Sequence, residues 1–160
     1  MTHIVDSINP WTCMPPLAMI ESLKFVADDQ SPIAEYATTV NGFQPMLGNL
    51  LLLDEPFIEH LRMEVQRVLD KHGIVGEIGR SWAVSYNHQG HQTAHKHREQ
   101  GDERYSGVVC LVGSKEGGEL CFNDKTYSMQ QGDIVLFKSE ELHWTNSTQY
   151  PKVVIAFDMK

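Results

Sequence analysis

The chain has no long hydrophobic run, little cysteine and few basic residues. Its 160 residues contain no run of roughly 18 to 20 consecutive apolar residues, which a membrane-spanning helix needs. The first eleven residues also lack the basic region and apolar core of a secretory signal. We therefore expect neither a membrane segment nor a signal peptide.

The cysteine count and the charge balance exclude further classes. Cys13, Cys110 and Cys121 are odd in number and widely spaced, which argues against a disulfide framework and favours a cytoplasmic, reduced protein. Thirteen basic residues stand against twenty-one acidic ones, for a net charge of −8, and the basic residues do not cluster. Phosphate binding needs a basic surface, so we expect no nucleic-acid partner.

The length suits a single domain over residues 1–160, whose two halves differ in character. Residues 1–75 are expected to form a mainly helical support region. Its clearest helix covers about 55–72, where apolar residues recur at helical spacing after Asp54, a suitable cap. Further helices are predicted at about 17–28 and from Ser31, and about 41–53 is expected to be extended.

The second half has the pattern of a β-sandwich. Short β-branched or aromatic runs alternate with glycine, asparagine and aspartate, which gives about eight strands over residues 80–160. Such spacing predicts a mainly β fold with N-terminal helices (α+β), namely a double-stranded β-helix of the jelly-roll or cupin-like type. The predicted strands are 81–86, 105–113, 118–122, 132–137 and 152–158, with shorter candidates at 125–129 and 142–145.

Histidines form the most informative pattern in this half. His95 and His97 are two positions apart, so in a strand they point to the same face. His143 begins a later predicted strand, and a sandwich can bring it opposite the pair. Three imidazoles suit iron, zinc, manganese, nickel or copper. The nearby His88 and His91 lack this context and are expected to lie in a polar loop.

These residues, in their order and spacing, resemble a known family. Tyr86, the His95–His97 pair, the segment YSGVVCLVGSKEGGELCF, the segment GDIVLFKSEELHW and Lys152 resemble the 2-oxoglutarate- and Fe(II)-dependent oxygenases. The resemblance is to the prolyl-hydroxylase-like branch and its small bacteriophage-type relatives, and it covers about residues 80–158. It implies a bacterial or phage-infected cell, Fe(II), 2-oxoglutarate and O2. It also implies hydroxylation of a C–H bond in a small molecule or a peptidyl side chain.

The resemblance also implies roles for single residues. His95, His97 and His143 occupy the positions of the three metal ligands. Lys152 stands where the family pairs a basic residue with the far carboxylate of 2-oxoglutarate. Tyr86 matches a tyrosine that lines the 2-oxoglutarate pocket.

His97 departs from the family pattern, which has aspartate or glutamate at this position. A neutral imidazole leaves the metal centre one unit more positive than a carboxylate does. Alternatively, His97 turns away and the carboxylate comes from Glu99, Asp102 or Glu103.

Two other functions stay open on the sequence. A three-histidine cupin-type metalloenzyme, for example a dioxygenase, would not use 2-oxoglutarate and would not need Lys152. A metal-free β-sandwich that serves in binding would have no reason to hold three histidines at strand spacing. The sequence specifies neither the substrate nor the oligomeric state.

Overall fold

The computed structural model describes residues 3–9, 38–44 and 49–160. The helices expected at 17–28 and from Ser31 lie outside the described residues, as does Cys13. Within the described parts the expected mainly β fold is confirmed, and most strands fall where the sequence predicts them. The elements are β1 (Ile4–Ser7), β2 (Thr39–Phe43), η1 (Leu50–Leu52), α2 (Pro56–Lys71), β3 (Ile78–His95), β4 (Tyr105–Val112), β5 (Leu120–Phe122), β6 (Thr126–Tyr127), β7 (Asp133–Lys138), β8 (His143–Thr145) and β9 (Lys152–Met159).

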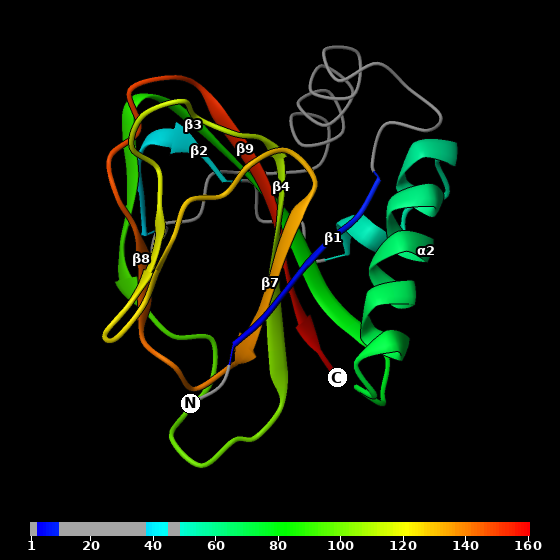
Figure 1. Ribbon diagram of the computed structural model, residues 1–160. Helices are drawn as coiled ribbons and strands as arrows, with labels where there is room; N and C mark the ends of the chain where they lie inside the picture. Colours follow the sequence, from blue (N-terminus) through cyan, green and yellow to red (C-terminus); the bar gives the residue numbers. More distant parts are fainter. Residues whose placement is uncertain (1–2, 10–37, 45–48) are drawn as a thin grey trace.

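The strands form one strongly curled antiparallel sheet (Figure 1). Its order is β1-β7-β4-β9-β3-β8-β5-β6, and β2 also pairs with β3. The long strand β3 joins the two halves of the sheet. Its first part, from Ile78 to Tyr86, pairs with β9, and its last part, from Gln92 to His95, pairs with β8. The sheet therefore curls around β3 into a sandwich.

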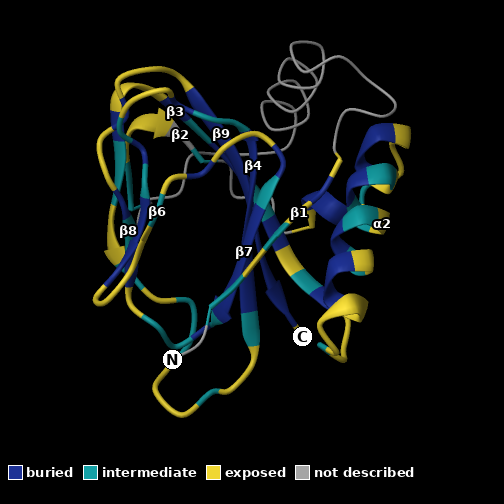
Figure 2. Ribbon diagram, in the orientation of Figure 1, coloured by how far each residue is buried: buried dark blue, intermediate teal, exposed yellow. Residues whose placement is uncertain are grey.

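Helix α2 covers the outer face of the sheet with an apolar stripe (Figure 2). Ile58, Leu61, Val65 and Leu69 recur every three or four residues and are buried against strands β3, β4, β7 and β9. Pro56 opens the helix, where its missing N–H costs no hydrogen bond. The expected side-chain cap at Asp54 is wrong, since the helix starts after Glu55 without one.

Strand β9 separates two apolar cores because its side chains alternate between faces. Val153, Ile155 and Phe157 belong to the core beneath α2. Val154 and Ala156 belong to a second core inside the curl of the sheet, with residues of β3, β4, β5 and β7. The whole strand is buried, as expected for one covered on both faces.

The structure departs from the sequence expectations in three places. The first 75 residues also supply strands β1 and β2, which pair with β7 and β3. Both are short edge strands, so their own residues carry little periodic signal. The segment with His88 and His91 belongs to β3 instead of a loop, because pairing with β2 extends the strand through polar residues. Within the described part of 41–53, the residues up to Phe43 are strand and Leu50–Leu52 form a 3-10 turn in place of an extended segment.

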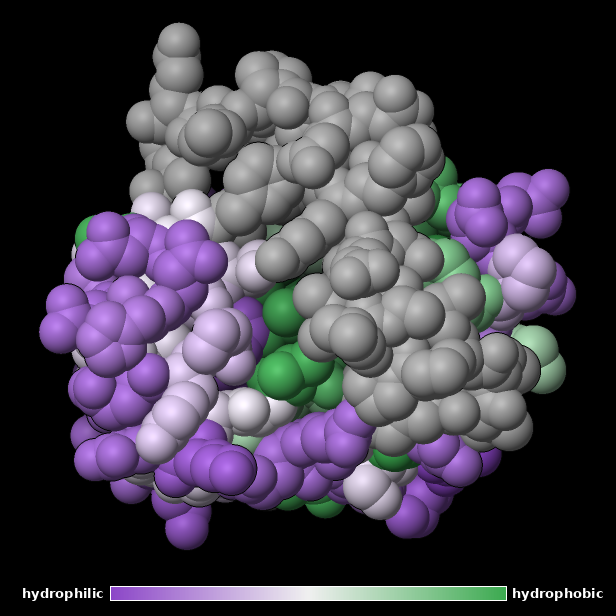
Figure 3. All heavy atoms as spheres, turned by 90° about the horizontal axis from the view of Figure 1, so that it is seen from above, coloured by the Kyte–Doolittle hydropathy of each residue, from purple (hydrophilic) through white to green (hydrophobic). Residues whose placement is uncertain are grey.

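No helix in the described ranges is long and apolar enough to cross a membrane. Seen from above, hydrophilic residues cover much of the described surface, with a smaller apolar area between them (Figure 3).

The α2 stripe should carry much of the stability of the fold. We expect Leu61→Ala, in the core, to lower the free energy of unfolding by about 2–5 kcal/mol, because it leaves a cavity. Met63→Ala, at a position that is 64% exposed on the same helix, should change it by less than about 0.5 kcal/mol. Urea unfolding followed by circular dichroism measures both, and equal effects would contradict this packing.

Candidate metal centre

Strand pairing brings the three predicted histidines together. His95 near the end of β3 lies directly opposite His143 at the start of β8. His97 follows two residues later on the same side. One ligand atom from each ring lies within 4.8 Å of those of the other two. The His95 and His143 ring centroids are 4.3 Å apart, and those of His97 and His143 are 4.9 Å apart.

Two of the rings are oriented by backbone carbonyl groups. His95 Nδ1 donates to the carbonyl oxygen of Thr93 at 2.7 Å, and His143 Nδ1 donates to that of Glu141 at 2.9 Å. A carbonyl can only accept, so each Nδ1 carries a proton and each neutral ring keeps an Nε2 lone pair. Neither Nε2 has a hydrogen-bond partner among the described residues. Such outer hydrogen bonds typically fix a histidine ligand for a metal.

The third ring is oriented by a carboxylate. His97 Nδ1 lies 2.6 Å from Oδ1 of Asp158, a fully buried residue of β9. Ser106 donates to the same oxygen at 2.7 Å, and Arg80 Nη2 lies 2.7 Å from Oδ2. Burial raises the pKa of Asp158, but these hydrogen bonds outweigh it and lower the pKa to about 2. The carboxylate is therefore charged at neutral pH.

Sequence reasoning missed Asp158 and considered other carboxylates instead. Glu99 is almost fully exposed, and its Oε2 lies 3.8 Å from Nζ of Lys96. Asp102 bonds to Arg104, and Glu103 is exposed. None of these three acids joins the histidine group within the described chain. The sequence signal that could have indicated Asp158 is its place at the end of the apolar run KVVIAFD, where an acidic residue continues a strand of mostly apolar residues.

Burial favours the neutral form of His95 and His143. It lowers the pKa of His95, and it lowers the pKa of His143 to about 3. A metal binds the neutral imidazole, so these rings need not lose a proton at neutral pH. Three imidazole nitrogen donors, with the second nitrogen of each ring already hydrogen-bonded, fit a borderline divalent ion such as Fe(II).

Lys152 and Tyr86 lie beside the histidines along the same cavity. Lys152 is 2% exposed, and its ammonium donates to the carbonyl oxygen of Gly118. Burial lowers its pKa, and no acidic side chain of the described residues forms an ion pair with it. Tyr86 is also buried, which raises its pKa, and its hydroxyl lies 3.3 Å from Oε1 of Gln92. The cavity is further lined by Trp82, Val84, Val108, Leu120, Thr145, Val154 and Ala156.

The glycine pair of the GGEL segment shapes one end of this cavity. Gly117 and Gly118 both have positive φ angles, of 76° and 72°. A side chain on Gly117 would collide with the carbonyl of Ser147. The turn therefore depends on glycine and presents the Gly118 carbonyl to Lys152.

The enclosed space between these side chains is narrow, about 20 Å³. That is room for about one water molecule. A larger ligand enters only when lining side chains move.

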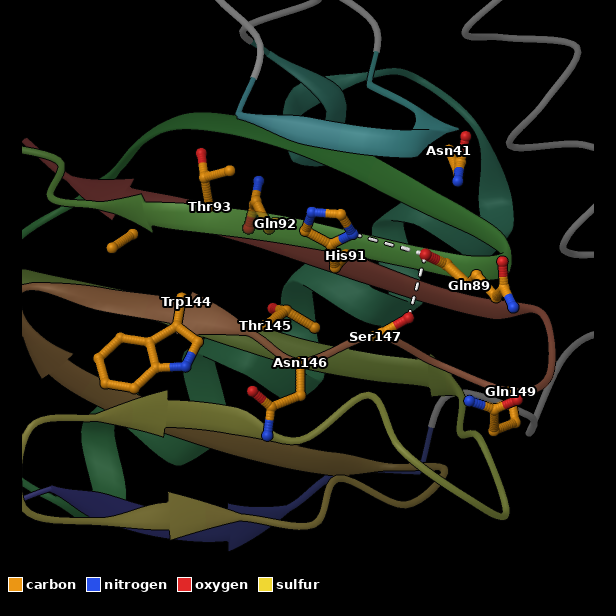
Figure 4. A pocket seen from close by; sticks show the side chains of 11 residues that line it. Asn41, Gln89, His91, Gln92, Thr93, Trp144, Thr145, Asn146, Ser147 and Gln149 are labelled. Carbon is orange, nitrogen blue, oxygen red and sulfur yellow. Dashed lines mark hydrogen bonds between the residues drawn. The ribbon is translucent and has the colours of Figure 1, made fainter.

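A larger, open pocket of about 870 Å³ adjoins the cavity (Figure 4). Gln92 and Thr145 line both spaces. The pocket runs along β3 and the segment that follows His143, and amide and hydroxyl side chains dominate its lining. Among the described residues that line it, Trp144 and His91 are aromatic and none is Lys, Arg, Asp or Glu.

A second group of possible ligands lies near the N-terminus. His3, Asp124 and Glu141 have donor atoms within 4.8 Å of one another. Both ring nitrogens of His3 already have partners, however, the Tyr127 hydroxyl and Glu141 Oε1, each at 2.7 Å. This arrangement is that of a structural histidine that ties β1 to the loop before His143.

No protein-family model matches the sequence, and no curated protein matches it. Solved structures do resemble the fold. The viral collagen prolyl hydroxylase of Paramecium bursaria Chlorella virus-1, in complex with 2-oxoglutarate, has a TM-score of 0.69 and 12% identity over 99% of this chain and 95% of that chain. A Pseudomonas putida prolyl-4-hydroxylase has a TM-score of 0.65 and 13% identity over 99% and 92%.

A Trichoplax adhaerens prolyl hydroxylase, in complex with a peptide fragment of hypoxia inducible factor, has a TM-score of 0.66 and 12% identity over 98% of this chain and 83% of that chain. At such identities the likeness concerns the fold alone. It confirms the fold that the sequence resemblance implies.

The neutral state of His143 predicts how the metal-free protein responds to pH. Its pKa in the folded state lies below the ordinary value of 6.5, so the unfolded chain takes up the proton first. Stability should therefore fall as the pH drops from 6.5 towards 4, by up to about 1.4 kcal/mol per pH unit from this residue. Urea unfolding of chelator-treated protein at a series of pH values measures this loss of stability. His143→Gln should reduce this slope, and an unchanged slope would contradict the burial argument.

Proposed function

We propose that the protein is an Fe(II)- and 2-oxoglutarate-dependent oxygenase that hydroxylates a C–H bond of a small molecule or a peptidyl side chain. One observation carries the proposal. Three imidazoles and a buried ammonium without an acidic partner among the described residues line the same cavity. A buried unpaired charge is costly, and an anionic ligand would offset that cost.

Each residue has a role under this proposal. His95, His97 and His143 hold Fe(II) through their Nε2 atoms. The metal and 2-oxoglutarate supply the oxidation by O2, in which the cosubstrate is decarboxylated. Lys152 neutralises the far carboxylate of 2-oxoglutarate, and the Tyr86 hydroxyl donates a hydrogen bond to the same ligand.

Binding of 2-oxoglutarate replaces the existing contact of Lys152. The Lys152 ammonium leaves the Gly118 carbonyl and turns to the far carboxylate of 2-oxoglutarate, and this movement widens the narrow cavity. Lysine does this as a point charge and does not impose the fork geometry of arginine. The ion pair is desolvated, so it is stronger than a surface pair.

The apolar wall protects the reaction from water. Val84, Val108, Leu120, Val154 and Ala156 surround the histidines and Lys152. A dry cavity limits side reactions of the oxidising centre. The adjoining pocket, which shares Gln92 and Thr145 with the cavity, offers uncharged hydrogen-bonding groups to a peptide or a small molecule.

Anaerobic titration tests the proposal. Untagged protein should bind one Fe(II) per chain, and 2-oxoglutarate should then produce a visible metal-to-ligand charge-transfer band. A protein that takes up no metal would contradict the proposal. Metal binding without a band at saturating 2-oxoglutarate would favour a three-histidine cupin-type enzyme instead.

Lys152 separates the two metalloenzyme functions. We expect Lys152→Met to keep the Fe(II) affinity and to weaken 2-oxoglutarate binding at least about 100-fold, since a buried charge pair is lost. Lys125→Met, at an exposed lysine, should leave both unchanged. Isothermal titration under nitrogen measures both affinities, and equal 2-oxoglutarate affinity in the two variants would rule out the assigned role of Lys152.

A further inference from the structure

We propose that Asp158 is a positioning residue that gives the metal centre, through His97, the negative charge which a carboxylate ligand would supply directly. The inference rests on the proposed function and concerns the one ligand that departs from the family pattern. In this arrangement the carboxylate does not bind the metal itself. It bonds to the His97 imidazole, which in turn binds the metal.

The three histidines differ in what holds them. His95 and His143 each donate Nδ1–H to a neutral carbonyl group. His97 donates to a carboxylate, at the shortest of the three distances, 2.6 Å. A charged acceptor makes the imidazole more basic and its Nε2 a stronger electron donor. His97, which occupies the position of the family's carboxylate ligand, is thus the histidine that is hydrogen-bonded to a carboxylate.

The surroundings fix Asp158 in this role. Its side chain is fully buried, and Ser106 donates to the oxygen that faces His97. Arg80 bonds to the other oxygen, but the Arg80 side chain is 64% exposed, so solvent screens its charge. The negative charge of Asp158 is therefore only partly compensated on the side away from the metal.

The backbone of His97 is held by Ser139, the residue that follows β7. The N–H groups of His97 and Arg98 both donate to the carbonyl oxygen of Ser139, at 2.9 Å and 3.0 Å. The Ser139 hydroxyl lies 2.7 Å from that of Ser106. One hydrogen-bonded network therefore fixes the backbone and the ring of His97 together, which leaves the ring little freedom to turn away.

Asp158→Asn tests the charge while the shape is conserved. We expect Fe(II) affinity to fall about 10- to 100-fold, the usual effect of losing such an outer partner. The charge-transfer band with 2-oxoglutarate should move to shorter wavelength, because a less electron-rich metal gives up an electron less readily. Asp133→Asn removes the same charge at the far end of β7, where Asp133 bonds to the Gln130 N–H, and should alter neither quantity.

A second pair of variants separates charge from structure. His97→Asp puts a carboxylate in the ligand position, so the negative charge reaches the metal directly and no imidazole connects Asp158 to it. Adding Asp158→Asn to His97→Asp should then change Fe(II) affinity by less than about threefold, compared with the 10- to 100-fold loss beside His97. This dependence on the residue at position 97 distinguishes a charge passed through His97 from a purely structural role, which predicts the same loss in both backgrounds.

The outcomes distinguish this inference from the proposed function. Wild-type protein without Fe(II) uptake or the band would contradict the proposed function itself. Wild-type binding with an unchanged affinity and band in Asp158→Asn would overturn only the role of Asp158. Should Asp158→Asn fail to fold alone, the comparison of His97→Asp with the double variant still decides, and a loss of Fe(II) affinity of about tenfold or more in the double variant would overturn the inference.

Discussion

The antiparallel pairing of β3 with β8 is the constraint on which the site depends. It sets His95 directly opposite His143, two residues that are far apart in the sequence. Since side chains alternate along a strand, a register shift of one residue would turn His143 away from the cavity. The length of β3, which pairs with both β9 and β8, is what allows the sheet to curl and close this pairing.

Strand β9 then supplies the charges of the site. Its alternating side chains place Lys152, Val154, Ala156 and Asp158 on the inner face, towards the cavity and the histidines. Lys152 and Asp158 lie at opposite ends of this face. Under the proposed function, this one strand would offer a cation to the far end of a dicarboxylate and an anion to the histidine that binds the metal. Burying two such charges costs stability, and metal and cosubstrate binding would recover part of it.

The sequence predicted the parts of the fold that have a strong local pattern. The α2 stripe and the β-branched runs of β4, β7 and β9 are periodic. Strand alternation was the reason to expect His95 and His97 on one face, but β3 ends at His95 and His97 lies in the bend that follows. The edge strands β1 and β2 are defined by their partners, so their own residues gave little signal. Asp158 was missed because its role appears only when β9 lies against the segment that carries His97, a contact between distant parts of the chain.

The central claim is that three histidines, with no protein carboxylate among the ligands, hold a metal that binds 2-oxoglutarate. An anaerobic crystal structure of the complex with Fe(II) and 2-oxoglutarate tests it most directly. We predict a metal bound by Nε2 of His95, His97 and His143, with Asp158 still on His97 Nδ1 and the far carboxylate of 2-oxoglutarate at Lys152. A metal held by a protein carboxylate, or His97 turned away from it, would contradict the account.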